Sequence, residues 1–290
     1  MICMKKNRGI LTSLIGLAIG YTSDEDIIRF LERFLSNFRE PDDTIEVFYT
    51  LTDLGKNKFT KILGELKYIL APRVGHLGNK IKILLPYMSQ SCRDCFIAFV
   101  NTLRKEIISS LSKQHFNDII TLLLNIALID EDTAVFFAES IGDLIVSLAK
   151  TEGIKHFGTI LWYTVLLKKK ILAQKLISIL HDLIIMKAFR LSDYGDLILW
   201  LGKGELEMGL HVYKIFKEHI FDKIKHTNIS DLIIFMVQIS KIPEIGKSIS
   251  KEIAPMVQQR ISKIENNKQM STLLMRLSKK YKILRLIINS

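Results

Sequence analysis

A pair of cysteines is the first residue pattern in the chain that could support chemistry. Cys92 and Cys95 form a CxxC, the spacing of redox-active dithiols and of half a zinc site. There is no second CxxC, and the third cysteine, Cys3, is far away in the sequence. The low and odd cysteine content predicts no disulfide framework and favours a reducing compartment. We interpret Cys92 and Cys95 as two thiols at a helix junction, with redox or zinc chemistry as the alternative.

Neither the histidines nor the glycines form a catalytic pattern. None of the seven histidines belongs to an HExxH motif or a close pair, and His181-Asp182 has no serine or cysteine at a recognisable spacing. Gly202-Lys203-Gly204 lacks the preceding strand and the spacing of a phosphate-binding loop, and its glycines are typical of helix C-termini. The sequence therefore predicts no enzyme, with no catalytic residues, metal, cofactor or small-molecule substrate.

Lysines near predicted helix ends are the strongest functional candidates. Residues 150–290 contain 24 Lys and Arg against 12 Asp and Glu, whereas residues 1–149 contain 17 against 18. Such asymmetry suggests an anionic partner such as nucleic acid or a membrane surface, although lysine also serves as a general solubilising residue. Lysines at helix C-termini also compensate the helix dipole. We predict RNA phosphate contacts from Lys155, Lys168, Lys169, Lys170, Lys203, Lys241, Lys279 and Lys280.

Repeated helix pairs are the elements that would position these lysines. The segment LSDYGDLILWLGK at residues 191–203 recurs 38 residues later as ISDLIIFMVQISK at residues 229–241. A fixed period of this length is the signature of a repeat architecture. The sequence predicts one all-α domain over residues 1–290, an α-solenoid of about eight helix-turn-helix repeats of 36–38 residues, the last one truncated. The repeats are predicted to start near residues 7, 43, 79, 115, 155, 193, 231 and 269.

Each repeat is predicted to contain a short first helix and a longer second helix. The first helices are apolar nearly all round, as in residues 191–203, so neighbouring repeats must cover them. The second helices have one apolar and one polar face. We expect Ala71-Pro72 to end a helix, and Pro86 and Pro255 to kink or shorten theirs. We expect Ser192 or Asp193, and Ser230 or Asp231, to cap their helices.

Residues at equivalent positions of such a stack form a stripe along one edge. A stripe with one cation per repeat could follow a phosphate backbone. Trp162 and Trp200 are 38 residues apart, which predicts one shared repeat position. Tryptophans can stack on bases, but apolar neighbours favour packing between repeats here.

The first 20 residues allow two interpretations. Lys5, Lys6 and Arg8 precede an apolar run from residue 10 to residue 21, which is typical of a signal peptide or an organellar presequence. The repeat frame places the first helix of the first repeat in the same segment, and we favour that interpretation. No run of 18 or more apolar residues occurs, so we predict no transmembrane helix and no membrane partner.

The repeat resembles the heptatricopeptide and octotricopeptide repeats, which also occur in proteins with FAST-kinase-like or RAP domains. The lines at residues 191–203 and 229–241, and TILW at residues 159–162, carry the resemblance over nearly the whole chain. The chain departs from these families in two ways, because it has no RAP domain and no PPPEW-type signature. The resemblance implies an RNA-binding α-solenoid in mitochondria or chloroplasts, acting in transcript processing or stability or in ribosome assembly.

Two functions from different classes follow as hypotheses. The first is RNA binding, to single-stranded or ribosomal RNA, in a mitochondrial ribonucleoprotein, as a processing factor, ribosome component or assembly factor. The second is a HEAT- or armadillo-like scaffold for protein partners with no nucleic-acid role, which suits the near-neutral residues 1–149 and a cytoplasmic location. A continuous positive strip favours RNA, whereas scattered lysines favour a scaffold.

Overall fold

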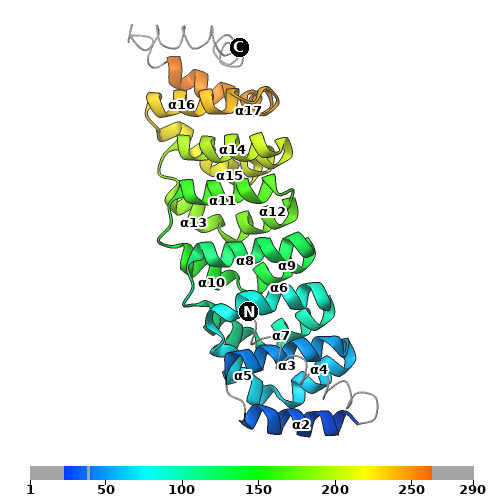
Figure 1. Ribbon diagram of the computed structural model, residues 1–290. Coiled ribbons are helices and arrows are strands. Elements are labelled where there is room, and N and C mark those ends of the chain that lie inside the picture. The colour runs from blue at the N-terminus through cyan, green and yellow to red at the C-terminus, as the bar shows by residue number, and fades with distance from the viewer. Residues whose placement is uncertain (1–22, 38–39, 263–290) are drawn as a thin grey trace, which may run out of the picture. The chain divides into compact units, whose positions relative to one another are not determined.

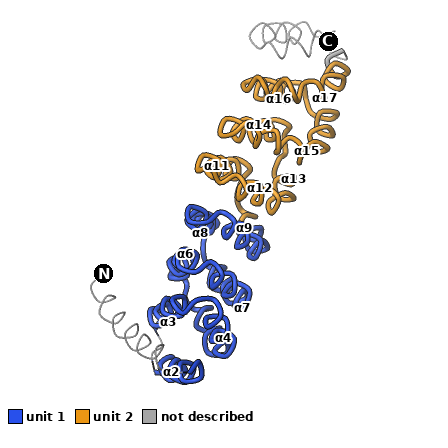
Figure 2. The backbone as a smooth tube through the Cα atoms, turned by 90° about the vertical axis from the view of Figure 1, so that its right-hand side faces the viewer, with its two compact units in different colours: residues 1–148 blue, residues 149–290 orange. Residues whose placement is uncertain are grey.

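The computed structural model describes residues 23–37 and 40–262, which form α-helices, one 3-10 helix and no strand (Figure 1). The predicted all-α class is thereby confirmed. The predicted repeat starts near residues 7 and 269, the possible targeting segment, Lys279 and Lys280 lie outside the described residues. By its internal contacts the chain divides into two compact units, residues 1–148 and 149–290 (Figure 2).

In unit 1, consecutive helices form two rows (Figure 2). Helices α3, α6 and α8 form the first row, in which each contacts the next, and α4, α7 and α9 belong to the second. The described elements of this unit are α2 (Asp24–Asn37), α3 (Pro41–Asp53), α4 (Lys56–Glu65), α5 (Lys67–Gly75), η1 (Gly78–Lys80), α6 (Ile81–Ser91), α7 (Arg93–Leu111), α8 (Phe116–Ile129), α9 (Glu131–Ser140) and α10 (Gly142–Ala149).

Unit 2 has the same two-row arrangement. Helices α11, α14 and α16 form its first row, and α12, α13, α15 and α17 form its second (Figure 2). Its described helices are α11 (Ile154–Leu166), α12 (Lys170–Ile179), α13 (His181–Lys187), α14 (Leu191–Gly204), α15 (Leu206–His226), α16 (Ile229–Ser240) and α17 (Pro243–Ser262). The six predicted repeat starts from 43 to 231 lie within two residues of the observed starts of the first-row helices.

Four of the second helices are interrupted, which the sequence analysis missed. Each interruption is a buried leucine or isoleucine whose backbone departs from helical geometry, with φ between −120° and −89° and ψ between 4° and 28°. Their spacings of 37 to 39 residues follow the repeat, which makes the bend a structural part of it: Leu66, Leu103, Ile141 and Leu180. Single second helices over residues 57–70, 132–148 and 171–189 were therefore the wrong prediction.

The prolines end none of the helices in which they lie. Pro72 is inside α5, Pro86 inside α6 and Pro255 inside α17. An internal proline removes one helical hydrogen bond and costs about 3 kcal/mol. Burial of apolar neighbours on both sides of each proline offsets this cost, and those neighbours are Leu70 and Val74, Leu85 and Met88, and Ile253 and Val257.

Basic residues near the ends of second-row helices connect successive repeats of unit 2. Their side chains donate to backbone carbonyls close to the end of the preceding second-row helix, where the helix dipole is negative. The recorded pairs are Lys187 with Lys150 O, Lys223 with Phe189 O, and Arg260 with Thr227 O. Part of the positive charge of this half therefore stabilises the stack.

A buried aspartate joins two first-row helices of unit 2. The Asp231 carboxylate in the first turn of α16 accepts hydrogen bonds from the backbone N–H groups of Leu191 (2.7 Å) and Ser192 (3.2 Å), at the start of α14. The hydroxyl of Thr227 also donates to it, at 2.9 Å. Burial favours the neutral carboxyl, but these hydrogen bonds outweigh burial and lower the pKa of Asp231. The N-cap of α16 is Asn228, not Ser230 or Asp231.

We expect Asp231→Ala to lower the free energy of unfolding by about 3 kcal/mol at pH 7, because two buried N–H groups lose their acceptor. The folded-state pKa is lowered, so this contribution is present above the unfolded carboxyl pKa of about 3.9 and is lost as the pH falls through the folded-state value. Urea unfolding at pH 7 and pH 3 tests both statements. Asp222→Ala, which changes an exposed carboxylate, is the control, and equal midpoints for the two variants at pH 7 would contradict the role of Asp231.

Candidate nucleic-acid interface

The lysines predicted for RNA binding lie along the first row of unit 2. Lys203 is in the last turn of α14 and Lys241 is the C-cap of α16. Both are exposed, and they occupy the same position twelve residues after the first residue of their helices. Lys155 is exposed in the first turn of α11. These side chains form no recorded ion pair within 4 Å among the described residues.

The lysine run after α11 separates into different roles. Lys168 has a left-handed φ of 58°, and its N–H donates to Val165 O while that of Lys169 donates to Thr164 O. This is the Schellman pattern that ends helices. Lys170 forms ion pairs with Glu205, at 3.1 Å, and with Glu207, and hydrogen bonds to both raise the pKa of its ammonium group. Lys168 and Lys169 thus remain available, whereas Lys170 connects α12 to the start of α15.

Exposed aromatic side chains lie on the same row. Tyr163 of α11 is 54% exposed and Trp200 of α14 is 36% exposed. Helices α11 and α14 begin 37 residues apart, at Ile154 and Leu191, so Trp200 is equivalent to Tyr163 and not to Trp162. The predicted shared position of Trp162 and Trp200 was therefore wrong by one residue. The sequence analysis missed Tyr163, which the spacing between helix starts would have found.

A shallow hollow lies between α11 and α14. Lys155, Gly158, Asp196 and Trp200 contribute to its lining. Gly158 allows the close approach, because a Cβ there would lie 3.3 Å from Leu197 and 3.8 Å from the Trp200 ring. A cation, a carboxylate and an indole ring therefore border one depression in the first row.

Asp196 is the acidic centre of this part of the row. It is half-buried, and the amide of Gln238 on α16 donates to its Oδ1 at 2.6 Å. Burial raises the pKa of Asp196, while the Gln238 hydrogen bond and the charges of Lys155 and Lys241 act in the opposite direction. Asp196 thus reduces the positive potential that these two lysines produce.

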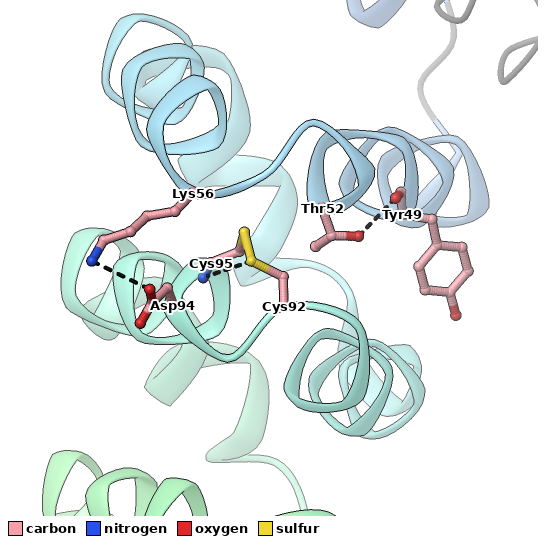
Figure 3. Close-up of a disulfide and its surroundings, with 6 residues drawn as sticks. All are labelled: Tyr49, Thr52, Lys56, Cys92, Asp94 and Cys95. Carbon is pink, nitrogen blue, oxygen red and sulfur yellow. Dashed lines mark hydrogen bonds and ion pairs between the residues drawn. A yellow bond between two sulfur atoms is a disulfide. The ribbon is translucent and has the colours of Figure 1, made fainter.

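The two expected thiols are joined in a disulfide at the junction of α6 and α7 (Figure 3). The expectation of a helix junction is correct, and the expectation of separate thiols is wrong. Folding places Cys92 at the N-cap of α7 and Cys95 one turn further on, within bonding distance. Within the described parts of the chain, no group of three or more His, Cys, Asp and Glu side chains is arranged to hold a metal ion.

No described helix is long and apolar enough to cross a membrane. Comparisons with protein-family models, with curated proteins and with solved structures found no match to this chain.

Proposed function

We propose that the first row of unit 2 binds single-stranded RNA. The observation that carries this proposal is the recurrence of an exposed aromatic ring and exposed lysines along successive helices: Tyr163 with Lys168 and Lys169, then Trp200 with Lys203, and then Lys241. Single-stranded nucleic acids are bound by aromatic rings that stack on bases together with cations that contact phosphates. The excess of lysine over arginine suits phosphate attraction more than base-specific recognition.

This proposal extends to the resemblance to heptatricopeptide-type repeats. Six repeat starts agree with the observed first-row helices to within two residues, which supports a regular 36–38-residue repeat. The class of partner that the resemblance implies is organellar RNA in a mitochondrial ribonucleoprotein. Ribosomal RNA and transcripts under processing are both candidates of this class.

Fluorescence anisotropy with short labelled single-stranded RNA, measured over a range of salt concentrations, tests the proposal. We expect log K to fall linearly with log salt, with a slope of about −2 to −4 for three to five phosphate contacts. We also expect Trp200→Ala to weaken binding by about 1–3 kcal/mol, because one stacked base is lost. Equal affinity for heparin and for RNA, with no effect of Trp200→Ala, would contradict a built RNA site.

A protein scaffold is the second candidate, and the exposed apolar side chains of the first-row helices favour it. In unit 1 these are Ile83 of α6 and Leu128 and Ile129 of α8. In unit 2, Leu166 and Ile234 are also exposed. A row of exposed apolar residues is typical of protein interfaces. A co-purifying protein that remains bound in high salt, together with no protected RNA segment, would favour the scaffold over RNA binding.

A further inference from the structure

We propose that Cys92 and Cys95 form a reversible thiol–disulfide exchange site, with Cys92 as the sulfur that exchanges with external thiols and disulfides. The site is in unit 1 and is independent of the RNA-binding proposal. Its substrates are low-molecular-weight or protein dithiols in the reducing direction, and disulfides in the oxidising direction.

The two sulfurs differ in accessibility, which assigns their roles. Cys95 is 0% exposed, whereas Cys92 is partly exposed at the surface between α6 and α7. An external thiolate must approach a sulfur directly to exchange with it. Cys92 is therefore the sulfur that is attacked, and Cys95 is the buried partner that leaves and later closes the bond again.

The position of Cys92 suits a reactive thiolate in the reduced form. Cys92 is the N-cap of α7, and its Sγ accepts the backbone N–H of Cys95 at 3.2 Å (Figure 3). An N–H donor and the positive end of a helix both stabilise negative charge at this sulfur. A thiolate, and not a thiol, is the attacking species in disulfide exchange.

Neighbouring ion pairs hold the CxxC in place from two sides. Asp94 pairs with Lys56 at the start of α4, at 3.3 Å (Figure 3). Arg93 pairs with Asp130, the N-cap of α9, at 3.1 Å. These contacts do not involve the sulfurs, so they keep the two cysteines together after reduction. In addition, a disulfide that closes so short a loop removes little entropy from the unfolded chain, which argues against stabilisation as its main effect.

The exchange balances in two steps. A thiolate of the dithiol attacks Cys92 Sγ, the Cys92–Cys95 bond breaks, and Cys95 leaves as a thiolate that takes a proton. The second thiol of the dithiol, as its thiolate, then attacks the mixed disulfide and releases Cys92 as a thiolate. Two electrons pass from the dithiol, which becomes a disulfide, to the protein, which becomes a dithiol. Oxidation by a disulfide follows the same steps in reverse.

Full-length protein with Cys3→Ser, which leaves only the pair, tests the proposal in glutathione buffers of varied ratio. Thiols are counted by mass after acid quenching and alkylation in denaturant, and helix content is followed by circular dichroism. We expect a reversible change between two thiols and none, with helix content retained. A pair that stays reduced in excess oxidised glutathione, or a disulfide that dithiothreitol reduces only after unfolding, would overturn the proposal.

Two further variants test which sulfur exchanges. We expect Cys95→Ser to form a mixed disulfide with oxidised glutathione at Cys92, and Cys92→Ser to react at Cys95 at least about tenfold more slowly. If either variant fails to fold, the rate of iodoacetamide labelling of each cysteine in the reduced Cys3→Ser protein gives the same information. Equal rates, or faster labelling of Cys95, would rule out the assignment of Cys92.

Discussion

Replacing Lys155, Lys203 and Lys241 together by glutamate should lower the affinity for single-stranded RNA by at least about 100-fold at 0.1 M salt. Each phosphate contact to a single strand contributes about 0.7 to the slope of log K against log salt, so three lost contacts should reduce that slope by about 2. These three lysines are exposed and carry no recorded ion pair among the described residues, so their loss should leave the stack intact. Anisotropy titrations at several salt concentrations measure both quantities.

A matched control separates this row from general charge effects. Lys225, Lys247 and Lys251 are exposed on α15 and α17 of the second row, and their replacement by glutamate changes the net charge by the same amount. We expect the control to keep most of the affinity, since charges away from the RNA are screened. Asp196→Asn removes the carboxylate near Lys155 and Lys241 and should tighten binding. Equal losses in both triple variants would contradict a specific row.

Gly209→Ala should lower the free energy of unfolding by about 3 kcal/mol, because α14 and α15 cross in close contact there. A Cβ at Gly209 would lie 2.8 Å from the Cα of Gly202 and 2.9 Å from the carbonyl oxygen of Ile198. Both atoms belong to the backbone of α14, so no side-chain rotation relieves the clash. The same Cβ would lie 2.5 Å from Ile245 Cδ1 of α17. The helices must therefore separate, and the contact with α17 loosens with them.

Gly64→Ala is the control for this prediction. Gly64 is an exposed residue of α4, and a Cβ there would meet nothing within 4 Å. Alanine is favoured over glycine in a helix by about 1 kcal/mol, so this variant should be more stable than the natural chain. Urea unfolding followed by circular dichroism measures both. Similar midpoints for the Gly209 and Gly64 variants would show that the crossing tolerates a Cβ.

The helical repeat was predictable from the sequence because it depends on local patterns. The apolar period of residues 191–203 and its copy at residues 229–241 locate α14 and α16 to within a residue or two at each end. The positions of Lys203 and Lys241 follow from the same pattern, since both belong to helix ends that recur with the repeat.

The partners of these residues were decided by the tertiary structure. Lys170 lies in the same run as Lys168 and Lys169, but only folding brings it to Glu205 and Glu207. The bends at Leu66 and Leu180 depend on burial against neighbouring helices, which local helix propensity does not include. Gly202 was interpreted as a helix C-terminal residue, and it does lie in the last turn of α14, but its contact with Gly209 appears only when α15 folds back.

The sequence by itself therefore determined the class of fold, the length of the repeat and the row of helix-end lysines, because each is encoded within a single helix or a single period. Only the tertiary structure decided which lysines are already paired, that Tyr163 matches Trp200, and that Cys92 and Cys95 form a bond between a partly exposed and a buried sulfur. The physical reason is that pairing, exposure and bonding depend on distances between helices, and those distances arise when the helices pack.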